Sequence, residues 1–257
     1  MLRAIQRLLN FHGWTNPQFS SPKGLGRIGV AGFATGFALG AHLSVIACLL
    51  LLKGLAFSWL ASERPTSIQW SLYMCSFSFF HFSEFFVVVF FKPDTVSYDS
   101  FVINHSLEYT AAVLLGWSEF WLEVFFLPGL KGRAGLLTAA GAAMVVVGHC
   151  FRIAAMWTAG SNFDHQIMRE REDSHQLVTH GVYRYLRHPS YFGWFWWSVG
   201  TQVLLCNPVG IVVYSGAAIL FFRGRIPYEE AFLCQFYPEE YPAYKVRTFI
   251  GIPFVTS

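Results

Sequence analysis

The chain has 257 residues, of which 54% are hydrophobic and 13% are charged. A soluble domain carries about 25% charged residues, and so few charges cannot solvate the surface of a water-soluble protein of this size. The net charge of +3 is small and dispersed, which argues against a nucleic-acid partner. Because backbone groups inside a bilayer must be satisfied internally, the composition predicts an all-α, polytopic membrane protein.

Apolar runs predict about six to eight transmembrane helices. A spanning helix needs about 20 apolar residues, and residues 28–60, 67–91, 105–127 and 134–159 meet this length. Residues 191–206 and 209–222 are shorter and are separated by Asn207-Pro208. Since Pro208 suits the first turn of a helix and ends the preceding one, these two runs predict a short helical hairpin. Six spans is the expected count, rising to eight if the first run is more folded.

Lysine and arginine predict the orientation. They concentrate in the N-terminal arm, in the loop after residue 159 and in the C-terminal tail, whereas the opposite side has Arg64, Lys131 and Arg133. By the positive-inside rule, both termini face the cytosol. We therefore expect N-terminal transmembrane helices over residues 1–159 and a cytosol-facing C-terminal region over residues 160–257 that carries the chemistry.

One glycine pattern imitates a dinucleotide-binding motif. Residues 24–29 read GLGRIG, but a Ser-Pro-Lys loop precedes them where that motif needs a strand. Gly32, Gly36 and Gly40 continue the four-residue spacing. On a membrane helix, this spacing predicts the close approach of a neighbouring helix.

Ionisable side chains occur about one turn apart within the predicted spans. These are His81 and Glu84, His105 and Glu108, and Glu119 and Glu123. Their order differs from the Glu-x-x-His of di-iron bundles, so we expect no metal. We expect them to pair with Arg152 or with each other, or to line a polar cavity.

Polar residues gather in two C-terminal stretches on either side of the hairpin. The first reads HQLVTHGVYRYLRHPSY over residues 175–191, and the second reads RGRIPYEE over residues 223–230. Because a hairpin returns the chain to its starting side, the two stretches should meet at the membrane surface. Contact with anionic lipid would account for the arginines, but not for the histidines, Ser190 and glutamates gathered beside them.

These stretches resemble the isoprenylcysteine carboxyl methyltransferase family. The resemblance runs from about residue 160 to residue 244 and includes AGSNF at residues 159–163. It extends to NHSLEY at residues 104–109. RHPSY followed by paired glutamates also occurs in phospholipid N-methyltransferases and in some NADPH-dependent sterol reductases. A sterol reductase, a phospholipid methyltransferase and a non-enzymatic membrane scaffold are therefore the alternatives.

The resemblance implies a reaction and a set of site residues. The implied reaction transfers the methyl group of S-adenosyl-L-methionine to the carboxylate of a prenylated C-terminal cysteine, leaving S-adenosyl-L-homocysteine. The implied substrates are prenylated CaaX proteins such as small GTPases, at the endoplasmic reticulum membrane. The implied donor contacts are Met168, His175, Gln176, Leu177, Val178, Tyr183, His188, Pro189, Ser190, Tyr191 and Glu229. Arg225 falls at the substrate position and, with Glu229, is the candidate catalytic residue. Met168 departs from the polar residue expected at its position.

The residue types suit this chemistry. The α-carboxylate is ionised at neutral pH because its pKa is about 3.5, so no general base is required. Arg225 can hold a carboxylate in a bidentate fork, and Glu229 can accept from the donor's amino group. The aromatic run at residues 194–197 opens the hairpin and is a candidate wall for the lipid path, although ordinary lipid contact explains it equally well.

Overall fold

The structure is a computed structural model that describes residues 17–54, 65–103, 106–132, 135–171 and 175–256. Asn104, His105, Arg64 and Arg133 lie outside these ranges. The elements in chain order are α2 (Pro17–Ser20), α3 (Leu25–Gly54), α5 (Pro65–Phe91), η2 (Pro93–Thr95), η3 (Tyr98–Phe101), α6 (Leu107–Phe126), α7 (Pro128–Gly132), α8 (Gly135–Ala159), η4 (Gly160–Asn162), η5 (Gly181–Arg184), α9 (Pro189–Leu205), α10 (Pro208–Phe236) and α11 (Glu240–Arg247).

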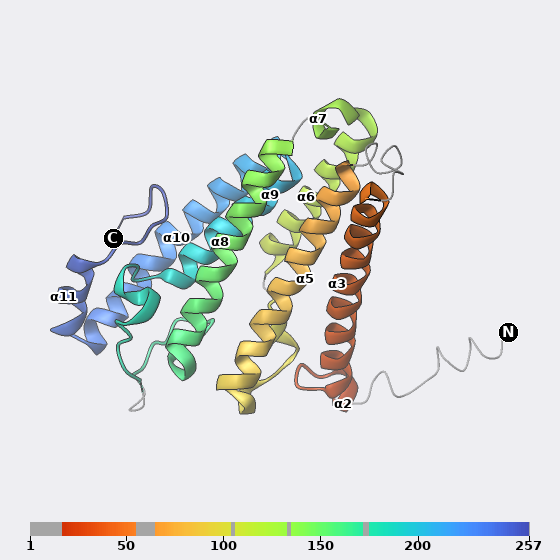
Figure 1. The fold of residues 1–257 in the computed structure, drawn as a ribbon. Helices are drawn as coiled ribbons and strands as arrows, with labels where there is room; N and C mark the ends of the chain where they lie inside the picture. The colour runs from red at the N-terminus through yellow and green to blue at the C-terminus, as the bar shows by residue number, and fades with distance from the viewer. Residues whose placement is uncertain (1–16, 55–64, 104–105, 133–134, 172–174, 257) are drawn as a thin grey trace.

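The described chain is a helical bundle, as predicted. In Figure 1, α3, α5 and α8 form a row of long helices, and α9 and α10 lie at the C-terminal end of this row. Four described helices, α3, α5, α8 and α10, are long and apolar enough to cross a membrane. α6 and the shorter α9, which has 17 residues, are not among these four. The protein is therefore a multi-pass membrane protein, and the count of six spans stays a prediction.

Glycine allows α8 and α9 to pack with their backbones in close approach. A Cβ on Gly148 would lie 2.4 Å from the backbone nitrogen of Trp197, and one on Gly193 would lie 2.5 Å from that of Arg152. Side chains at these positions would force the helices apart, so the interface depends on glycine. The backbones of the two helices are therefore in direct contact.

The prediction that the α3 glycines form such an interface is wrong within the described structure. A Cβ on Gly36 or Gly40 would have no heavy atom within 4 Å, and one on Gly32 would only touch Phe101 at 3.9 Å. Small-residue spacing makes a face smooth, but it does not determine whether a second helix lies against that face.

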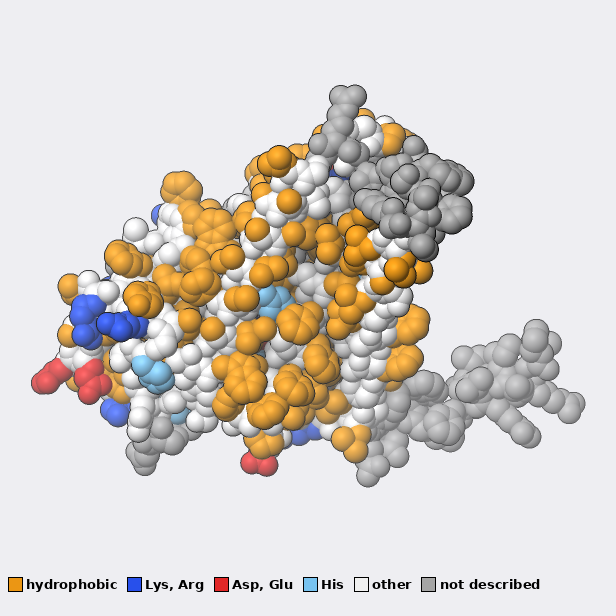
Figure 2. All heavy atoms as spheres, viewed as in Figure 1, with side chains coloured by type: hydrophobic (Ala, Val, Ile, Leu, Met, Phe, Trp, Pro, Cys, Tyr) orange, Lys and Arg blue, Asp and Glu red, His pale blue; other side chains and the backbone are white. Residues whose placement is uncertain are grey.

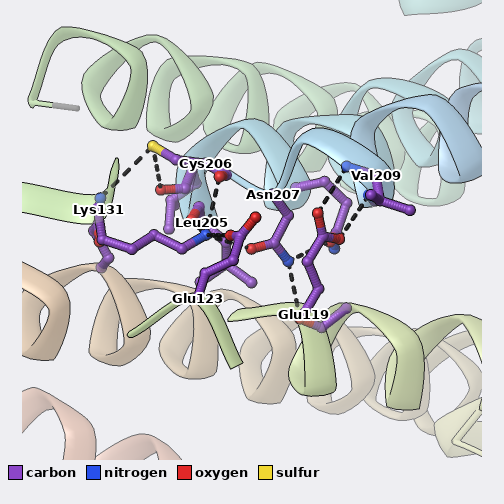
Figure 3. A network of polar contacts seen from close by, with 12 residues as sticks. Glu119, Glu123, Lys131, Leu205, Cys206, Asn207 and Val209 are labelled. Carbon is purple, nitrogen blue, oxygen red and sulfur yellow. Dashed lines mark hydrogen bonds and ion pairs between the residues drawn. The ribbon is translucent and has the colours of Figure 1, made fainter. Parts of the chain in front are cut away.

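Buried polar contacts fix the turn between α9 and α10 (Figure 3). The ammonium group of Lys131 donates to the carbonyl oxygens of Leu205 and Cys206 at 2.7 and 2.9 Å, and to Asn207 Oδ1 at 2.8 Å. It also forms an ion pair with Glu123 at 2.5 Å, and its side chain is fully buried. A cation at this position satisfies carbonyl groups that the end of α9 leaves without helical partners.

Glu119 performs the complementary role at the start of α10. Its carboxylate accepts from the backbone N–H groups of Val209 and Gly210, both at 2.7 Å. A carboxylate suits the positive end of the helix dipole. We name the contacts of Glu119, Glu123, Lys131 and Asn207 the turn clasp. Glu119 and Glu123 thus serve the fold.

α10 is longer than the sequence predicts. The prediction ended this helix at Phe222 and placed short helices afterwards, but α10 continues through Pro227 to Phe236. An internal proline costs about 3 kcal/mol. Ile226 and Glu230 on either side of Pro227 are buried, and Glu230 is held there by Arg187, His188 and Lys245. As a result, α10 extends beyond the apolar run and presents Arg225 and Glu229 on one continuous helix.

After α11, the chain turns back alongside α10 (Figure 1). Ile250, Ile252 and Val255 are buried in one core with Phe195 of α9 and Phe222 of α10. This segment covers a face of the hairpin and holds its two helices together.

The surface agrees with a bilayer environment. Figure 2 shows hydrophobic side chains spread over the face formed by α3, α5 and α8, with basic and acidic groups gathered at the α11 end and at the lower margin. This arrangement places the polar part of the molecule at one end of the bundle.

Candidate functional site

A cavity of about 180 Å³, which we name the loop cavity, lies at the polar end of the bundle. Its walls come from the segment between α8 and α9, η5, the first turn of α9, the end of α10, and α11. Every residue predicted to contact the donor lines it: Met168, His175, Gln176, Leu177, Val178, Tyr183, His188, Pro189, Ser190, Tyr191 and Glu229. Residues separated by 61 positions in sequence thus share one cavity, although their binding role stays a prediction.

A second cavity, of about 440 Å³, lies among α5, α6, α9 and α10, and we name it the bundle cavity. Aromatic side chains including Tyr73, Phe77 and Trp194 line it, and Arg225 is among its polar residues. From the aromatic run at 194–197, Trp194 and Trp197 reach this cavity. Phe195 and Trp196 instead pack in the core that holds the returning C-terminal segment.

The two cavities meet at Tyr191, which lines both. Its hydroxyl accepts from Nε of Arg225 at 2.8 Å and donates to Oε2 of Glu229 at 2.5 Å. Nη2 of Arg225 donates to the carbonyl oxygen of His165 at 2.7 Å. The phenol of Tyr191 therefore connects the cation of the bundle cavity to the carboxylate of the loop cavity. Tyr191 and the His165 carbonyl together fix the plane of the Arg225 guanidinium.

The two polar stretches meet as predicted, and buried Glu230 joins them. Its carboxylate accepts from Nε of Arg187 at 2.7 Å, lies 3.1 Å from Nε2 of His188, and forms an ion pair with Lys245 at 2.7 Å. These contacts tie α10 to the segment before α9 and to α11. Glu230 thus holds together elements that form the loop cavity without lining it, whereas Glu229 lines it.

A second buried pair supports the start of α9. Arg152 donates from Nε and Nη2 to the two carboxylate oxygens of Glu84 at 2.7 and 2.8 Å. Its Nη1 donates to the hydroxyl of Ser190, and Nε2 of His165 lies 2.7 Å from Glu84. The predicted pairing of Glu84 with Arg152 is confirmed. The contact with His165 was missed, because that residue lies 81 positions away with no motif around it.

His81 does not join this pair. Its Nδ1 lies 2.8 Å from the carbonyl oxygen of Phe101, and its Nε2 lies 3.0 Å from the hydroxyl of Tyr109. The i, i+3 spacing from Glu84 therefore reports a shared helix face and not a shared partner.

The segment leading into the loop cavity is held by side chains near its start. Asn162 accepts from the backbone N–H of Gln176 at 2.9 Å. Burial would raise the pKa of Asp164, but its hydrogen bond from Lys92 at 2.8 Å and that from the Gln166 backbone hold this pKa below its ordinary value. An ionised Asp164 therefore fixes the segment to the end of α5.

Aromatic residues from the end of α10 and from α11 form part of the loop cavity that the sequence analysis missed. Phe232, Tyr237, Tyr241 and Tyr244 line it, and the three tyrosines form one buried cluster. Burial raises the pKa of Tyr241 and Tyr244, which keeps both phenols neutral. Their i, i+4, i+3 spacing along the chain is the signal that could have revealed this aromatic wall.

The fold and the site together define a helical membrane protein in which a polar cavity adjoins an apolar one. Residues 141–235 match the sequence profile of the isoprenylcysteine carboxyl methyltransferase (ICMT) family. A solved structure of the eukaryotic intramembrane Ras methyltransferase ICMT covers 98% of this chain and 86% of its own length, with a TM-score of 0.78 and 36% identity.

Three relatives, each called protein-S-isoprenylcysteine O-methyltransferase or its A form, are similar in sequence. The mouse protein is 54% identical over 71% of this chain, the human protein 49% over 83%, and the Arabidopsis thaliana protein 44% over 74%. The matches cover 64%, 75% and 96% of those relatives respectively, so the chain spans slightly less than two thirds of the mouse protein. The chain belongs to the isoprenylcysteine carboxyl methyltransferase family.

Proposed function

We propose that this protein transfers a methyl group from S-adenosyl-L-methionine to the α-carboxylate of a prenylated C-terminal cysteine. Family membership supports this reaction. The observation that carries it is the chain of hydrogen bonds Arg225–Tyr191–Glu229, which joins an apolar cavity to a polar one. A lipid-bearing carboxylate and a polar donor would meet at this junction.

The residues of the loop cavity fit the donor. Glu229 supplies a carboxylate for an ammonium group, while Tyr183, Tyr237 and Tyr244 supply aromatic surface for a nucleoside. When bound, the donor supplies an electrophilic methyl group on a sulfonium. Tyr191 and His188 lie stacked at the inner end of the cavity, with ring centroids 5.4 Å apart. They exclude water from the junction and orient Glu229.

Arg225 fits the carboxylate of the substrate. Two of its nitrogens are held by Tyr191 and by the His165 carbonyl, which leaves its remaining N–H groups to bind a carboxylate in a planar fork. The carboxylate needs no base at neutral pH. Catalysis by this chain would therefore consist of positioning and desolvation at the junction.

The bundle cavity suits the prenyl chain. The hairpin contributes Trp194, Trp197 and Phe221 on one side, and α5 and α6 contribute Tyr73 and Ala112 on the other. Keeping a prenyl chain in apolar surroundings gains about 0.8 kcal/mol per CH₂. We therefore propose lateral entrance from the bilayer between the hairpin and α6, with Arg225 at the polar end.

The proposal also covers the number of spans, their orientation and the substrates. We propose six membrane spans, with α6 and α9 added to the four longest helices, and both termini and the loop cavity on the cytosolic side. Prenylated CaaX proteins such as small GTPases at the endoplasmic reticulum would be the substrates, with S-adenosyl-L-homocysteine released as the second product. Residues 160–257 would hold the donor.

The test is methyl transfer by the purified chain in liposomes. Radiolabelled S-adenosylmethionine and a minimal prenylcysteine should give a base-labile methyl ester, whereas the same cysteine without its prenyl chain should not. Incubation with NADPH and a sterol substrate is the comparison for a reductase. Reduction of the sterol without ester formation would reject the proposal.

A further inference from the structure

We propose that residues 248–255, named the return segment, form a lipid-binding surface that lies in the bilayer interface and holds the hairpin there. The segment follows α11 and turns back alongside α10 (Figure 1). Its occupant is phospholipid at the boundary between headgroups and acyl chains. The readouts below do not depend on methyl transfer, so this inference and the proposed function can fail separately.

The return segment is apolar on both of its faces. Ile250, Ile252 and Val255 are 4–6% exposed and pack against the hairpin. Phe249 and Phe254 alternate with them and are 73% and 80% exposed. A segment facing water would present polar residues on this outer face, whereas a segment facing lipid would present aromatic residues.

The depth of the return segment follows from its packing partners. Phe195 and Phe222 belong to the hairpin, and Phe222 is the last residue of the apolar run of α10, directly before Arg223. Gly251 approaches α9 so closely that a Cβ there would lie 2.7 Å from the Phe192 ring. Because these contacts lie where the apolar runs of the hairpin end, they place the segment at the bilayer interface.

Backbone groups at the start of the return segment have hydrogen-bond partners, which a position close to hydrocarbon requires. The N–H of Phe249 donates to the Tyr185 carbonyl at 3.0 Å, and the N–H of Arg187 donates to the Phe249 carbonyl at 3.0 Å. The guanidinium of Arg187 donates to the Thr248 carbonyl at 2.8 Å. Satisfied backbone groups are a requirement for irregular structure close to hydrocarbon.

The charges beside the segment complement anionic headgroups. Arg184 and Arg247 are exposed next to exposed Tyr185 and Phe249. The acidic residues Glu239 and Glu240 lie at the far end of α11, whereas its last turn is basic. Aromatic side chains flanked by cations are typical of an interfacial anchor.

The primary test uses the unmodified chain in phosphatidylcholine liposomes that contain a phosphatidylcholine with a diazirine on its acyl chain. After irradiation, peptides spanning residues 248–255 should carry lipid adducts at a level similar to the α10 peptide that contains exposed Leu220. The peptide containing Glu239 should carry at least about tenfold fewer. Labelling at Leu220 with none at residues 248–255 would overturn the proposal.

Substitutions give a second, independent readout. Phe249→Cys and Phe254→Cys, with the five native cysteines replaced by alanine and an environment-sensitive fluorophore attached, should be quenched by lipids with acyl-chain nitroxides. Glu239→Cys is the matched control and should not be quenched. Adding phosphatidylserine to the liposomes should increase the lipid adducts on residues 248–255 of the unmodified chain. The double substitution Arg184→Gln with Arg247→Gln should abolish this increase. Cross-links between two copies through residues 248–255 would instead assign this surface to self-association and overturn the inference.

Discussion

At the level of single residues, Tyr191 connects the two charged groups of the site. The phenol lies between Arg225 and Glu229 and lines both cavities. Donation to the Glu229 carboxylate requires that the phenol stay protonated. It can therefore donate and accept at once, which an apolar ring cannot.

Replacing Arg225 should affect the proposed carboxylate substrate and not the binding of the methyl donor. Arg225→Ala should lower methyl transfer about 100-fold or more because the carboxylate loses its positioning partner, while binding of S-adenosylmethionine, measured by calorimetry, stays close to that of the unmodified chain. Arg225→Lys should restore little, since a point charge cannot reproduce the fork. An equal loss of donor affinity would move Arg225 to the donor site.

Removing the Tyr191 hydroxyl should disconnect Arg225 from Glu229. We expect Tyr191→Phe to lower kcat about 10- to 100-fold, because hydrogen bonds to charged groups contribute about 1.5–3 kcal/mol. Tyr228→Phe, on the same helix as Glu229 but 47% exposed, is the matched control and should leave kcat unchanged. Full activity of Tyr191→Phe would show that the bridge is dispensable.

At the level of elements, α8 and α9 form the most closely packed pair in the described chain, and this contact positions the first turn of α9. Gly148→Ala should destabilise the protein by about 1–3 kcal/mol because its Cβ would lie 2.4 Å from a backbone nitrogen. Thermal unfolding in detergent measures the effect. Gly216→Ala, with no atom within 4 Å of the added Cβ, is the control and should not lower the midpoint. Equal midpoints for the two variants would contradict the packing argument.

The turn clasp makes a second prediction. Lys131→Met should cost about 3 kcal/mol, because it leaves the partly buried Glu123 without its cation and the carbonyls of Leu205 and Cys206 without a donor. Adding Glu123→Gln to Lys131→Met should recover part of this loss in the same unfolding measurement. No recovery would mean that the carbonyl contacts alone account for the cost.

The sequence predicted elements better than it predicted their partners. Apolar length located α5, α6 and α8 to within two residues, since a helix in lipid must be long and continuous. It placed close packing on the α3 glycines instead of Gly148 and Gly193, because spacing does not reveal which helix lies opposite. It also ended α10 too early, because the partners that hold Glu230 after Pro227 are tertiary neighbours that the local sequence does not reveal.

The site was predictable where a motif marks it and not elsewhere. The family resemblance, carried by the HPSY run and the stretches beside it, named residues that line the loop cavity, and their binding role stays a prediction. The aromatic wall from α11 and the contact of His165 with Glu84 arise from the folded path of the chain. No local pattern contains that information.

At the scale of the whole molecule, the lysines and arginines predict that both termini face the cytosol. An N-terminal and a C-terminal epitope should therefore both be digested when protease is added to intact microsomes. A tag fused after residue 132, in the loop between α7 and α8, is the control and should be protected until detergent is added. Protection of both termini would reverse the predicted orientation, and protection of one terminus alone would require an odd number of spans.

The contact between the two cavities also determines how ligands can be exchanged. The cavities share Phe163, Asp164 and Tyr191 among their described lining residues, and their other lining residues differ, although α8, α9 and α10 contribute to both. A water-soluble ligand leaving the loop cavity therefore need not displace one lodged in the bundle cavity. If the proposed reaction holds, a spent donor would be replaced from the aqueous side while a lipid-bearing ligand stays in the bundle cavity, and the methylated product would leave in the plane of the membrane.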